Sequence, residues 1–511
     1  FQDQAFTAAQ DLEVSPAARA LAQTAARAAF TRKTAAGDAR VRQALAGQVP
    51  QIEGQLAQAL PQDDPAKAAR VGAALDAVGR ELASLDARLL KDNPKYPEII
   101  SPPPLSIAEA QKRLKPGEGM LFIVPTGDDV HVFALSRTRV AWRRIENGQA
   151  QLEGRIRALR CQVDDGACGG KVRPASEGHV APFDLQVAYS LYRDLVLPVE
   201  GALGGVDRLF VTTSGVFASL PLGLLPIAAP ADGKTNSQAL AATSWLADRY
   251  ALTTLPSVNS LRTTAPSTRP AAQRWAFVGY GDPAIEGLTP GAPTDAKAAN
   301  PAFAPLPGTA DELRAMARTL GAPQTRLHLG GKATEASIKS SREIATAGVV
   351  AIATHGLLSH EIQGLGEPGL VLTPPAKPDG QDDGVLTASE AAALELTADW
   401  VILSACNTAG SDGEPGADSL SGLARAFLYA GARALLVSHW RVFDDATAAL
   451  TVQTLAIQKA DPRLSKAQAL QKAMHTVRTG RLPDGSPLPG WRAEWAHPAY
   501  WAPFVVIAAD G

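Results

Sequence analysis

The sequence predicts an α/β protein whose C-terminal half is a doubly wound parallel sheet of about six strands. Short runs of β-branched and apolar residues recur and end in small residues, as strands buried on both faces do. Segments with apolar residues at helical spacing lie between these runs, which is the order of a parallel sheet with crossover helices. The expected strands are residues 275–279, 326–329, 349–354, 400–404, 432–437 and 504–507.

The helices of this half are indicated by their capping residues. Thr309 and Glu312 have the spacing of a capping box, so we expect a helix to begin at Thr309. Asp418 or Ser419 would cap a helix that stops at Gly431. The expected helices are residues 309–320, 333–341, 387–396, 418–431, 446–458 and 465–478.

Residues 1–92 are expected to form a separate helical region. Apolar residues keep one face of a helix for four turns, at Leu75, Val78, Leu82, Leu85 and Leu89. Glycine and proline breaks divide the region into three or four antiparallel helices. The region is similar to tetratricopeptide repeats, but without a clean 34-residue period a plain helical bundle is an equal alternative.

A proline-rich linker follows, and the chain then becomes α/β over residues 101–261. Residues 120–125 and 130–135 read as a β-hairpin, residues 184–197 as a helix, and residues 207–213 and 250–255 as strands. Lys234 and Thr235 follow a glycine, but Ala228 stands where a phosphate-binding loop needs its first glycine. We therefore expect no nucleotide site there, and no cofactor site elsewhere.

Composition narrows the class of protein. A chain of 511 residues predicts two to four domains. The net charge of −2, without a basic stripe, gives no support to nucleic-acid binding, and no apolar run approaches the length of a membrane span.

The chain begins at Phe1, so we expect a processed or trimmed form. The spacing of Cys161 and Cys168 allows a disulfide in a periplasmic or secreted protein, and two free thiols in the cytoplasm are an equal alternative.

Two chemically active residues follow two of the expected strands. His355-Gly356 comes after the strand at 349–354, and Cys406 comes after the strand at 400–404, 51 residues beyond His355. Because the carboxyl ends of parallel strands meet at one edge of a sheet, the imidazole and the thiol would emerge together. A thiol with a base to ionise it is a nucleophilic pair. Taken alone, Cys406 would be a small buried hydrophobe, and a metal site with His360 and His439 is disfavoured by the spacing.

Several motifs in order resemble those of the CHAT family, which contains caspase-like proteases of clan CD related to separase and often fused to tetratricopeptide repeats. They are Thr-His-Gly at 354–356, Ser-Ala-Cys-Asn-Thr at 404–408, Gly-Leu-Ala-Arg-Ala-Phe-Leu-Tyr-Ala-Gly-Ala at 422–432 and Val-Ser-His-Trp-Arg-Val at 437–442. The resemblance covers roughly residue 183 to the C-terminus. It implies a catalytic caspase-like subdomain at 270–511, preceded by a degenerate caspase-like subdomain at 101–261.

The resemblance also implies roles for individual residues. His355 would be the general base, Cys406 the nucleophile, and the backbone N–H groups of Gly356 and Cys406 the oxyanion donors. The substrate pocket would be bordered by Ser438, His439, Trp440, Asp444 and Asp445.

Two charges compete to set specificity in that stretch. Arg441 would favour an acidic residue before the cleaved bond, whereas Asp444 matches the separase-like pattern Trp-x-Val-x-Asp and favours a basic one. We predict cleavage after Arg or Lys. In the alternative interpretation, Asp444 and Asp445 merely cap the helix that begins near Ala446.

The sequence thus predicts a cysteine endopeptidase that cuts a protein or peptide and is regulated by a partner docking on residues 1–92. The loops at 364–369 and 410–416 would be lids, and 377–384 would be a site of self-cleavage. A caspase-like scaffold without turnover is the alternative, and an acyltransferase with the same two residues stays open. We expect no metal, nucleic acid or membrane as a partner.

Overall fold

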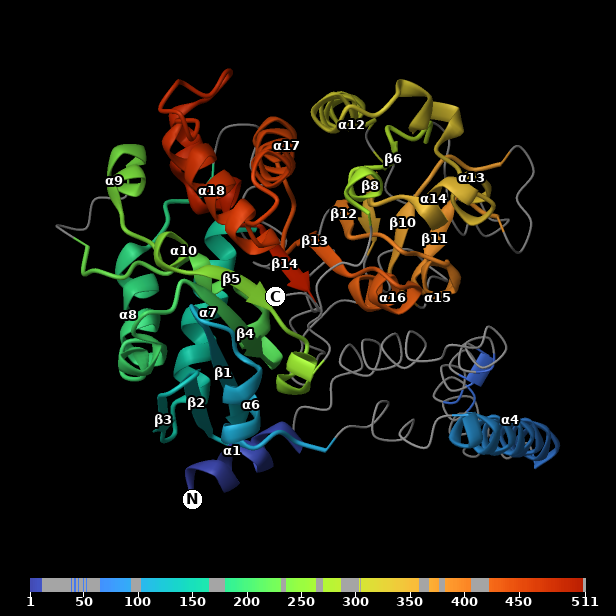
Figure 1. Ribbon diagram of the computed structural model, residues 1–511, viewed down its shortest axis with the longest axis horizontal. Coiled ribbons are helices and arrows are strands. Elements are labelled where there is room, and N and C mark those ends of the chain that lie inside the picture. Colours follow the sequence, from blue (N-terminus) through green and yellow to red (C-terminus); the bar gives the residue numbers. More distant parts are fainter. Residues whose placement is uncertain are drawn as a thin grey trace. The chain divides into compact units, whose positions relative to one another are not determined.

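The fold is described by a computed structural model of the 511-residue chain (Figure 1). The structure describes residues 1–11, 38, 41–42, 45, 49, 52, 65–92, 103–164, 180–230, 236–262, 270–285, 303, 305–357, 367–375, 382–405 and 422–508. Cys406, the expected lid at 410–416, the first three residues of the expected lid at 364–369 and most of residues 377–384 lie outside this set. The chain divides into two compact units, Phe1–Ala17 with Pro104–Gly511, and Ala18–Pro103.

The smaller unit contains the long helix α4 (Pro65–Asp92). Leu85 and Leu89 are buried on this helix, and Leu75, Val78 and Leu82 are less exposed than the residues around them. The apolar face expected from the sequence is therefore confirmed. Two ion pairs, Arg42 with Asp86 and Arg88 with Asp38, connect α4 to the residues that precede it.

The larger unit is organised around one sheet of eleven described strands (Figure 1). The strand order is β3-β2-β1-β4-β5-β14-β13-β12-β8-β6-β7. The strands are β1 (Glu118–Thr126), β2 (Asp129–Ser136), β3 (Val140–Ile145), β4 (Arg208–Thr213), β5 (Ala251–Thr254), β6 (Phe277–Gly281), β7 (Leu327–Leu329), β8 (Val349–Ala353), β12 (Trp400–Ser404), β13 (Ala434–Ser438) and β14 (Phe504–Ala508).

The last strand in the chain joins the two halves of this sheet. β14 pairs in parallel with β5 of the first α/β region, and in antiparallel orientation with β13 of the second. The second region contributes β6, β7, β8, β12, β13 and β14, so the expectation of about six strands is confirmed. The expectation that all six run parallel is corrected at β14, because this strand follows the direction of its other neighbour, β5.

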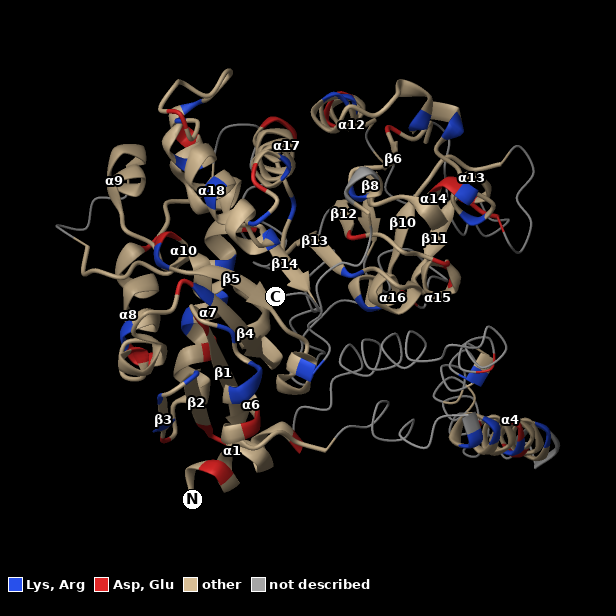
Figure 2. Cartoon of the chain, in the orientation of Figure 1, with Lys and Arg blue, Asp and Glu red and all other residues tan. Residues whose placement is uncertain are grey.

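Helices cover both faces of the second half of the sheet. Trp400 and Ile402 of β12 lie in the cluster that packs against α12 (Pro307–Leu320), α17 (Asp444–Ala460) and α18 (Lys466–Thr479). The alternate residues Val401 and Leu403 are also fully buried, so the opposite face is covered as well. There α16 (Gly422–Ala430) packs on β13, and α15 (Ala388–Ala393) packs on α16. Charged side chains are absent from β8, β12 and β13 and lie mainly on the helices (Figure 2).

The first half of the sheet carries its own helices. These are α1 (Gln2–Asp11), α6 (Ile107–Arg113), α7 (Gln149–Val163), α8 (Leu185–Leu195), α9 (Ser237–Ala242) and α10 (Leu246–Arg249). The expected hairpin is present as β1 and β2, and Asp184 caps α8 with its side chain on two backbone N–H groups. Cys161 of α7 is disulfide-bonded, and the other two cysteines of the chain, Cys168 and Cys406, lie outside the described residues.

The helix α1 packs on the α/β sheet rather than with the helical region in which we expected it. The ring of Phe6 is fully buried and makes edge contacts with Phe122 and Phe133 of the sheet. The side-chain amide of Gln10 donates to the carbonyl of Leu105 at 2.8 Å and accepts from its N–H at 2.9 Å. The expected region 1–92 is therefore divided, with its first helix belonging to the larger unit.

The start of α12 also differs from the expected capping box. The helix begins two residues earlier at Pro307, which suits the first helical position because it lacks an N–H. Thr309 therefore lies inside the first turn, where its hydroxyl donates to the carbonyl of Leu306 and accepts from the N–H of Asp282. Glu312 therefore does not cap the helix, and its side chain is buried in the core.

Candidate active site

The strands β8 and β12 are parallel neighbours, and their register aligns Ala353 with Ser404. The ladder continues one residue further, because the N–H of Thr354 donates to the carbonyl of Ser404 at 3.3 Å. His355 follows on one strand and Ala405 on the other, and Cys406 is the next residue in the chain. The structure thus brings His355 and the residue before Cys406 to the same edge of the sheet, while Cys406 itself lies outside the described residues.

A small second sheet holds the backbone after His355. It consists of β9 (Gly356–Leu357), β10 (Gly369–Val371) and β11 (Val385–Thr387), which are too short for their sequence pattern to predict. Gly356 pairs with Leu370, and the N–H of Val371 donates to the carbonyl of His355 at 2.9 Å. The half-buried imidazole of His355 lies against the ring of Phe303, with 5.3 Å between the ring centres.

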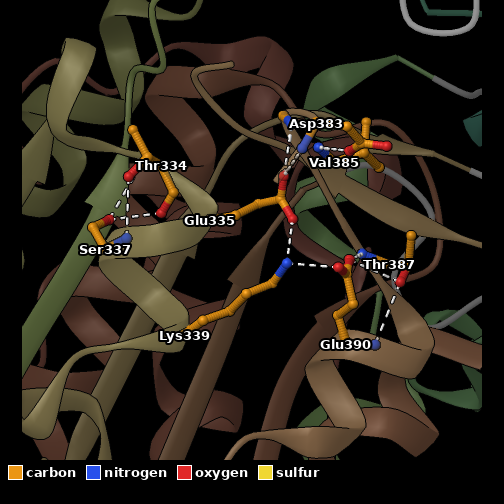
Figure 3. Close-up of polar contacts among 9 residues, drawn as sticks. Thr334, Glu335, Ser337, Lys339, Asp383, Val385, Thr387 and Glu390 are labelled. Carbon is orange, nitrogen blue, oxygen red and sulfur yellow. Dashed lines mark hydrogen bonds and ion pairs between the residues drawn. The ribbon is translucent and has the colours of Figure 1, made fainter. Parts of the chain in front are cut away.

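An ion network around one buried carboxylate anchors the far edge of this small sheet (Figure 3). Glu335 of α13 (Glu335–Lys339) is fully buried, and one of its oxygens accepts from the N–H groups of Asp383 and Gly384 at 2.8 and 2.6 Å. The ammonium of Lys339 lies 2.6 Å from the other oxygen of Glu335 and 2.6 Å from Glu390.

Glu390, the second carboxylate of the network, connects Lys339 to the end of β11. Glu390 accepts from the N–H and hydroxyl of Thr387, at the junction of β11 and α15, and forms a capping box there. The sequence predicted helices at both positions but not the network that joins them. On α13, Glu335 and Lys339 are four residues apart and look like an ordinary surface pair. Glu335 is fully buried and both of its oxygens are bonded, whereas Lys339 and Glu390 are partly exposed. The buried carboxylate therefore fixes the backbone of Asp383 and Gly384.

A second buried carboxylate lies beside the end of β12. Glu312 accepts a hydrogen bond from the hydroxyl of Ser404 at 3.0 Å and another from Thr451 of α17 at 2.8 Å. Burial raises the pKa of Glu312 to about 7, against the opposing effect of these two hydrogen bonds, and Asp444 adds a smaller repulsion. Sequence reasoning missed this role because Glu312 matched a local capping pattern.

The last residue of β13, Ser438, also bonds to the backbone that follows β12. The hydroxyl of the fully buried Ser438 donates to the carbonyl of Ala405 at 2.5 Å. Ser438 was expected to border the substrate pocket, and the structure instead gives it a bond to the residue that precedes Cys406.

Two other expected substrate residues are packed in the core. The indole of Trp440 is fully buried, donates to the carbonyl of Ala499 at 3.1 Å, and lies under the guanidinium of Arg160 at 5.3 Å. His439 is also buried, and its backbone N–H and carbonyl bond to Pro503 and Arg160. Neither side chain is presented at the surface in this structure.

Asp444 and Asp445 lie in the first turn of α17 and are exposed. The helix begins at Asp444, after Phe443, so neither aspartate is its capping residue. Asp445 forms an ion pair with Arg492. The carboxylate of Asp444 instead lies close to Gly308 in the first turn of α12, where the positive end of the helix dipole favours an anion.

Among the described residues, no group of three or more His, Cys, Asp or Glu side chains is arranged to hold a metal ion. Within the same part of the chain, no helix has both the length and the apolar character needed to cross a membrane.

Comparison with known proteins gives one family match. The model of the CHAT domain matches residues 185–509, which is more than half of the chain. Mouse tetratricopeptide repeat protein 28 is 26% identical over 404 residues, and the matched part covers 68% of this chain. The chain spans only 14% of the length of that relative.

Two solved structures give weak matches. The Saccharomyces cerevisiae separase–securin complex aligns with 85% of this chain and 33% of the matched chain, at 11% identity and a TM-score of 0.41. The Arg-specific cysteine proteinase gingipain R aligns with 71% of this chain and 74% of its own, at 9% identity and a TM-score of 0.31.

The buried carboxyl of Glu312 predicts a pH-dependent stability. Its folded-state pKa of about 7 lies above the ordinary value of 4.5, so its contribution to stability is full below pH 4.5 and is lost as the pH rises to 7. Replacing it by Gln removes this titration. Between pH 5 and pH 8, the wild type should lose roughly 2–3 kcal/mol relative to Glu312→Gln, measured by urea unfolding.

The exposed neighbour Asp311 provides the matched control on the same helix. Asp311→Asn should follow the wild-type stability at every pH, because its carboxylate is already in water. A constant difference between Glu312→Gln and the wild type across this pH range would contradict the assignment.

Proposed function

Because the chain belongs to the CHAT domain family, we propose that it is a cysteine endopeptidase in which His355 and Cys406 form the catalytic pair. The observation that carries the proposal is the parallel register of β8 and β12, which aligns the two strands from which these residues follow. A family whose members resemble caspase-like proteases and a pair of chemically suited residues at one sheet edge point to the same reaction.

In the proposed reaction, the imidazole of His355 takes the proton from the thiol of Cys406, and the thiolate attacks the carbonyl carbon of the scissile peptide. The N–H groups of Gly356 and Cys406 stabilise the negative oxygen of the tetrahedral intermediate. His355 then returns the proton to the leaving amine, and a thioester remains. Water, deprotonated by His355, hydrolyses this thioester and frees the thiol.

The hydrogen bonds around the site suit this reaction because they fix backbone groups rather than side chains. The small sheet β9-β10-β11 holds the peptide of Gly356, and the network of Glu335 and Lys339 anchors that sheet. Ser438 and Glu312 restrain the end of β12. Preorganised donors of this kind are worth more than donors that must reorient during the reaction.

For specificity, we propose that Asp444 recognises a basic residue before the cleaved bond. Asp444 is exposed at the start of α17, lies close to the first turn of α12, and is near enough to the buried Glu312 to raise its pKa. Substrate contacts through Ser438, His439 and Trp440 would require movement, because these three side chains are buried.

We also propose that a partner protein regulates the enzyme by docking on residues 1–92. The division of the chain supports this, because Ala18–Pro103 is a separate compact unit. The alternative function is a caspase-like scaffold for protein interaction without turnover, and the chemistry of Cys406 distinguishes the two.

The first prediction concerns the reactive pair. Cys406→Ala should lower peptidase activity about 10³-fold or more, because the nucleophile is removed. His355→Ala should slow alkylation of Cys406 by iodoacetamide, because the base that ionises the thiol is lost. Mass spectrometry of the alkylated peptides provides the measurement, and the wild type at raised pH, where any thiol ionises, is the control.

Equal alkylation rates in the wild type and His355→Ala would favour the scaffold alternative. Residual activity of more than a few per cent in Cys406→Ala would exclude Cys406 as the nucleophile.

A second prediction concerns the residue before the cleaved bond. A peptide-library digest should show cleavage after Arg or Lys. Asp444→Ala should lower kcat/KM for such peptides about 10²-fold, provided that the bound substrate shields the exposed carboxylate from water, since a shielded charge pair supplies a few kcal/mol. Asp445→Ala is the matched control and should have little effect. An unchanged preference in Asp444→Ala would contradict this role.

A third prediction concerns regulation. Replacing Ala18–Pro103 by a flexible linker should raise the activity of the isolated chain several-fold, measured with a fluorogenic peptide. Removing residues 1–92 is a different change, because it also deletes the core residue Phe6 and should lower stability by about 3–5 kcal/mol. Full activity of the intact chain, unchanged by the linker, would count against regulation by this unit.

A further inference from the structure

Glu312 bonds to two elements that the proposed reaction uses, the strand that leads to Cys406 and the helix that begins with Asp444. It lies on α12, which packs against α17 and against β6 and β8 (Figure 1). One carboxyl oxygen, Oε2, is 3.0 Å from the hydroxyl of Ser404, the last residue of β12. The other oxygen, Oε1, is 2.8 Å from the hydroxyl of Thr451 within α17. One buried side chain therefore connects the two elements.

The hydroxyl of Thr451 allows two hydrogen-bond arrangements around this carboxyl. Its single proton can go to Glu312 at 2.8 Å or to the carbonyl of Thr447 at 3.0 Å. When Glu312 is ionised, Thr451 and Ser404 both donate to the carboxylate. When Glu312 is protonated at Oε1, its O–H donates to Thr451, Thr451 donates to Thr447, and Ser404 still donates to Oε2. Both arrangements keep these groups bonded without a change of side-chain position.

The surroundings of Glu312 make both forms accessible near neutral pH. Burial raises its pKa to about 7, whereas the bonds from Thr451 and Ser404 lower the pKa because they favour the carboxylate. Asp444 adds a repulsion from the start of α17.

The other elements around Glu312 add few charges. β8 and β12 carry no charged residue. Further charged or titratable groups on the neighbouring elements interact elsewhere: Asp445 with Arg492, Lys459 with the carbonyl of Thr319, Asp282 with Asp311 and Arg314, and Tyr280 with His328.

Ser404 passes the state of Glu312 to both strands of the proposed catalytic pair. Its carbonyl accepts from the N–H of Thr354, directly before His355, and it stands two residues before Cys406. A hydrogen bond to a carboxylate is roughly twice as strong as one between neutral groups. Ionisation of Glu312 therefore strengthens the bond to Ser404, even though burial makes the carboxylate costly for the fold as a whole.

We propose that Glu312 is a positioning residue, which in its ionised form holds Ser404, and with it the backbone that leads to Cys406, more tightly than in its neutral form. This inference rests on the proposed function. The proton that Glu312 releases goes to water. A basic side chain of the substrate at Asp444 would cancel the repulsion from that carboxylate and so favour the ionised form. Substrate binding and placement of the nucleophile would thereby support each other.

The test compares the full wild-type chain with Glu312→Gln, which keeps a neutral hydrogen-bonding side chain of the same length at every pH. The rate at which iodoacetamide alkylates Cys406 is measured by mass spectrometry of the peptide that contains it. Dividing the wild-type rate by the variant rate removes the titration of the thiol itself. The ratio should be constant below about pH 5.5 and should rise about twofold or more as the pH passes 7.

Two controls separate positioning from a merely structural role. The ratio of the wild type to Asp311→Asn, an exposed neighbour on α12, should not change with pH. Ser404→Ala removes the bond but keeps the carboxyl, so adding Glu312→Gln to this variant should give a ratio without a step. A ratio of wild type to Glu312→Gln that is independent of pH would overturn the proposal. A falling ratio would also overturn it, because the carboxylate would then act as a charge that disfavours the thiolate.

The link to the substrate site has its own measurement. Asp444→Asn imitates the loss of charge caused by a bound basic side chain. In this background the midpoint of the step should lie at lower pH than in the wild type, because a repulsion that raises the pKa of Glu312 is removed. Asp445→Asn is the matched control and should leave the midpoint in place, because Asp445 pairs with Arg492. An unmoved midpoint in Asp444→Asn would overturn this link.

Alkylation needs no substrate, so this inference and the proposed function fail separately. A chain that cuts no peptide but shows the step would contradict the peptidase proposal alone. A chain whose peptidase activity depends on Cys406 but which shows no step would contradict the role of Glu312 alone.

Discussion

The parallel pairing of β8 with β12 is the constraint on which the rest of the site depends. Its register aligns Ala353 with Ser404, so His355 and Ala405 follow at the same edge of the sheet. A shift of one residue would turn every side chain of a strand to the other face. Both faces of these strands are covered by helices, so such a shift would bring poorly matched side chains into the packed layers on both sides.

Around this register, polar groups are buried at the places where backbone position matters. Glu335, Glu312 and Ser438 are all buried, and each bonds to a segment that leads to the site. Burying a carboxylate costs several kcal/mol before its partners compensate, so the net contribution of Glu335 and Glu312 to stability is much smaller than the sum of their hydrogen bonds. Their effect is on specificity of conformation, since only one arrangement satisfies all of their hydrogen bonds.

The sequence predicted the elements with strong local signals and missed those set by tertiary contacts. The strands that precede His355 and Cys406 were predicted from their apolar runs, and the hairpin of β1 and β2 from its alternation. Short strands such as Gly356–Leu357 have too few residues to show a period. Glu312 was misassigned because a capping pattern is local, whereas its actual partners, Ser404 and Thr451, are 92 and 139 residues away.

The predicted substrate residues show the same limit. Their order along the chain placed them next to the end of β13, but it did not predict the direction of each side chain. Trp440 and His439 are buried, and both contact Arg160 of α7, some 280 residues earlier in the chain. No pattern within the segment carries that information.

The central place of β14 has a consequence for how the protein is made. This strand is the sixth of the eleven in the sheet, yet its residues are the last of the sheet to leave the ribosome. At about 5–20 residues per second, the roughly 250 residues between β5 and β14 take on the order of 10–50 s to synthesise. During that time β5 presents an unpaired edge. The two halves of this sheet therefore cannot join until synthesis has passed residue 508.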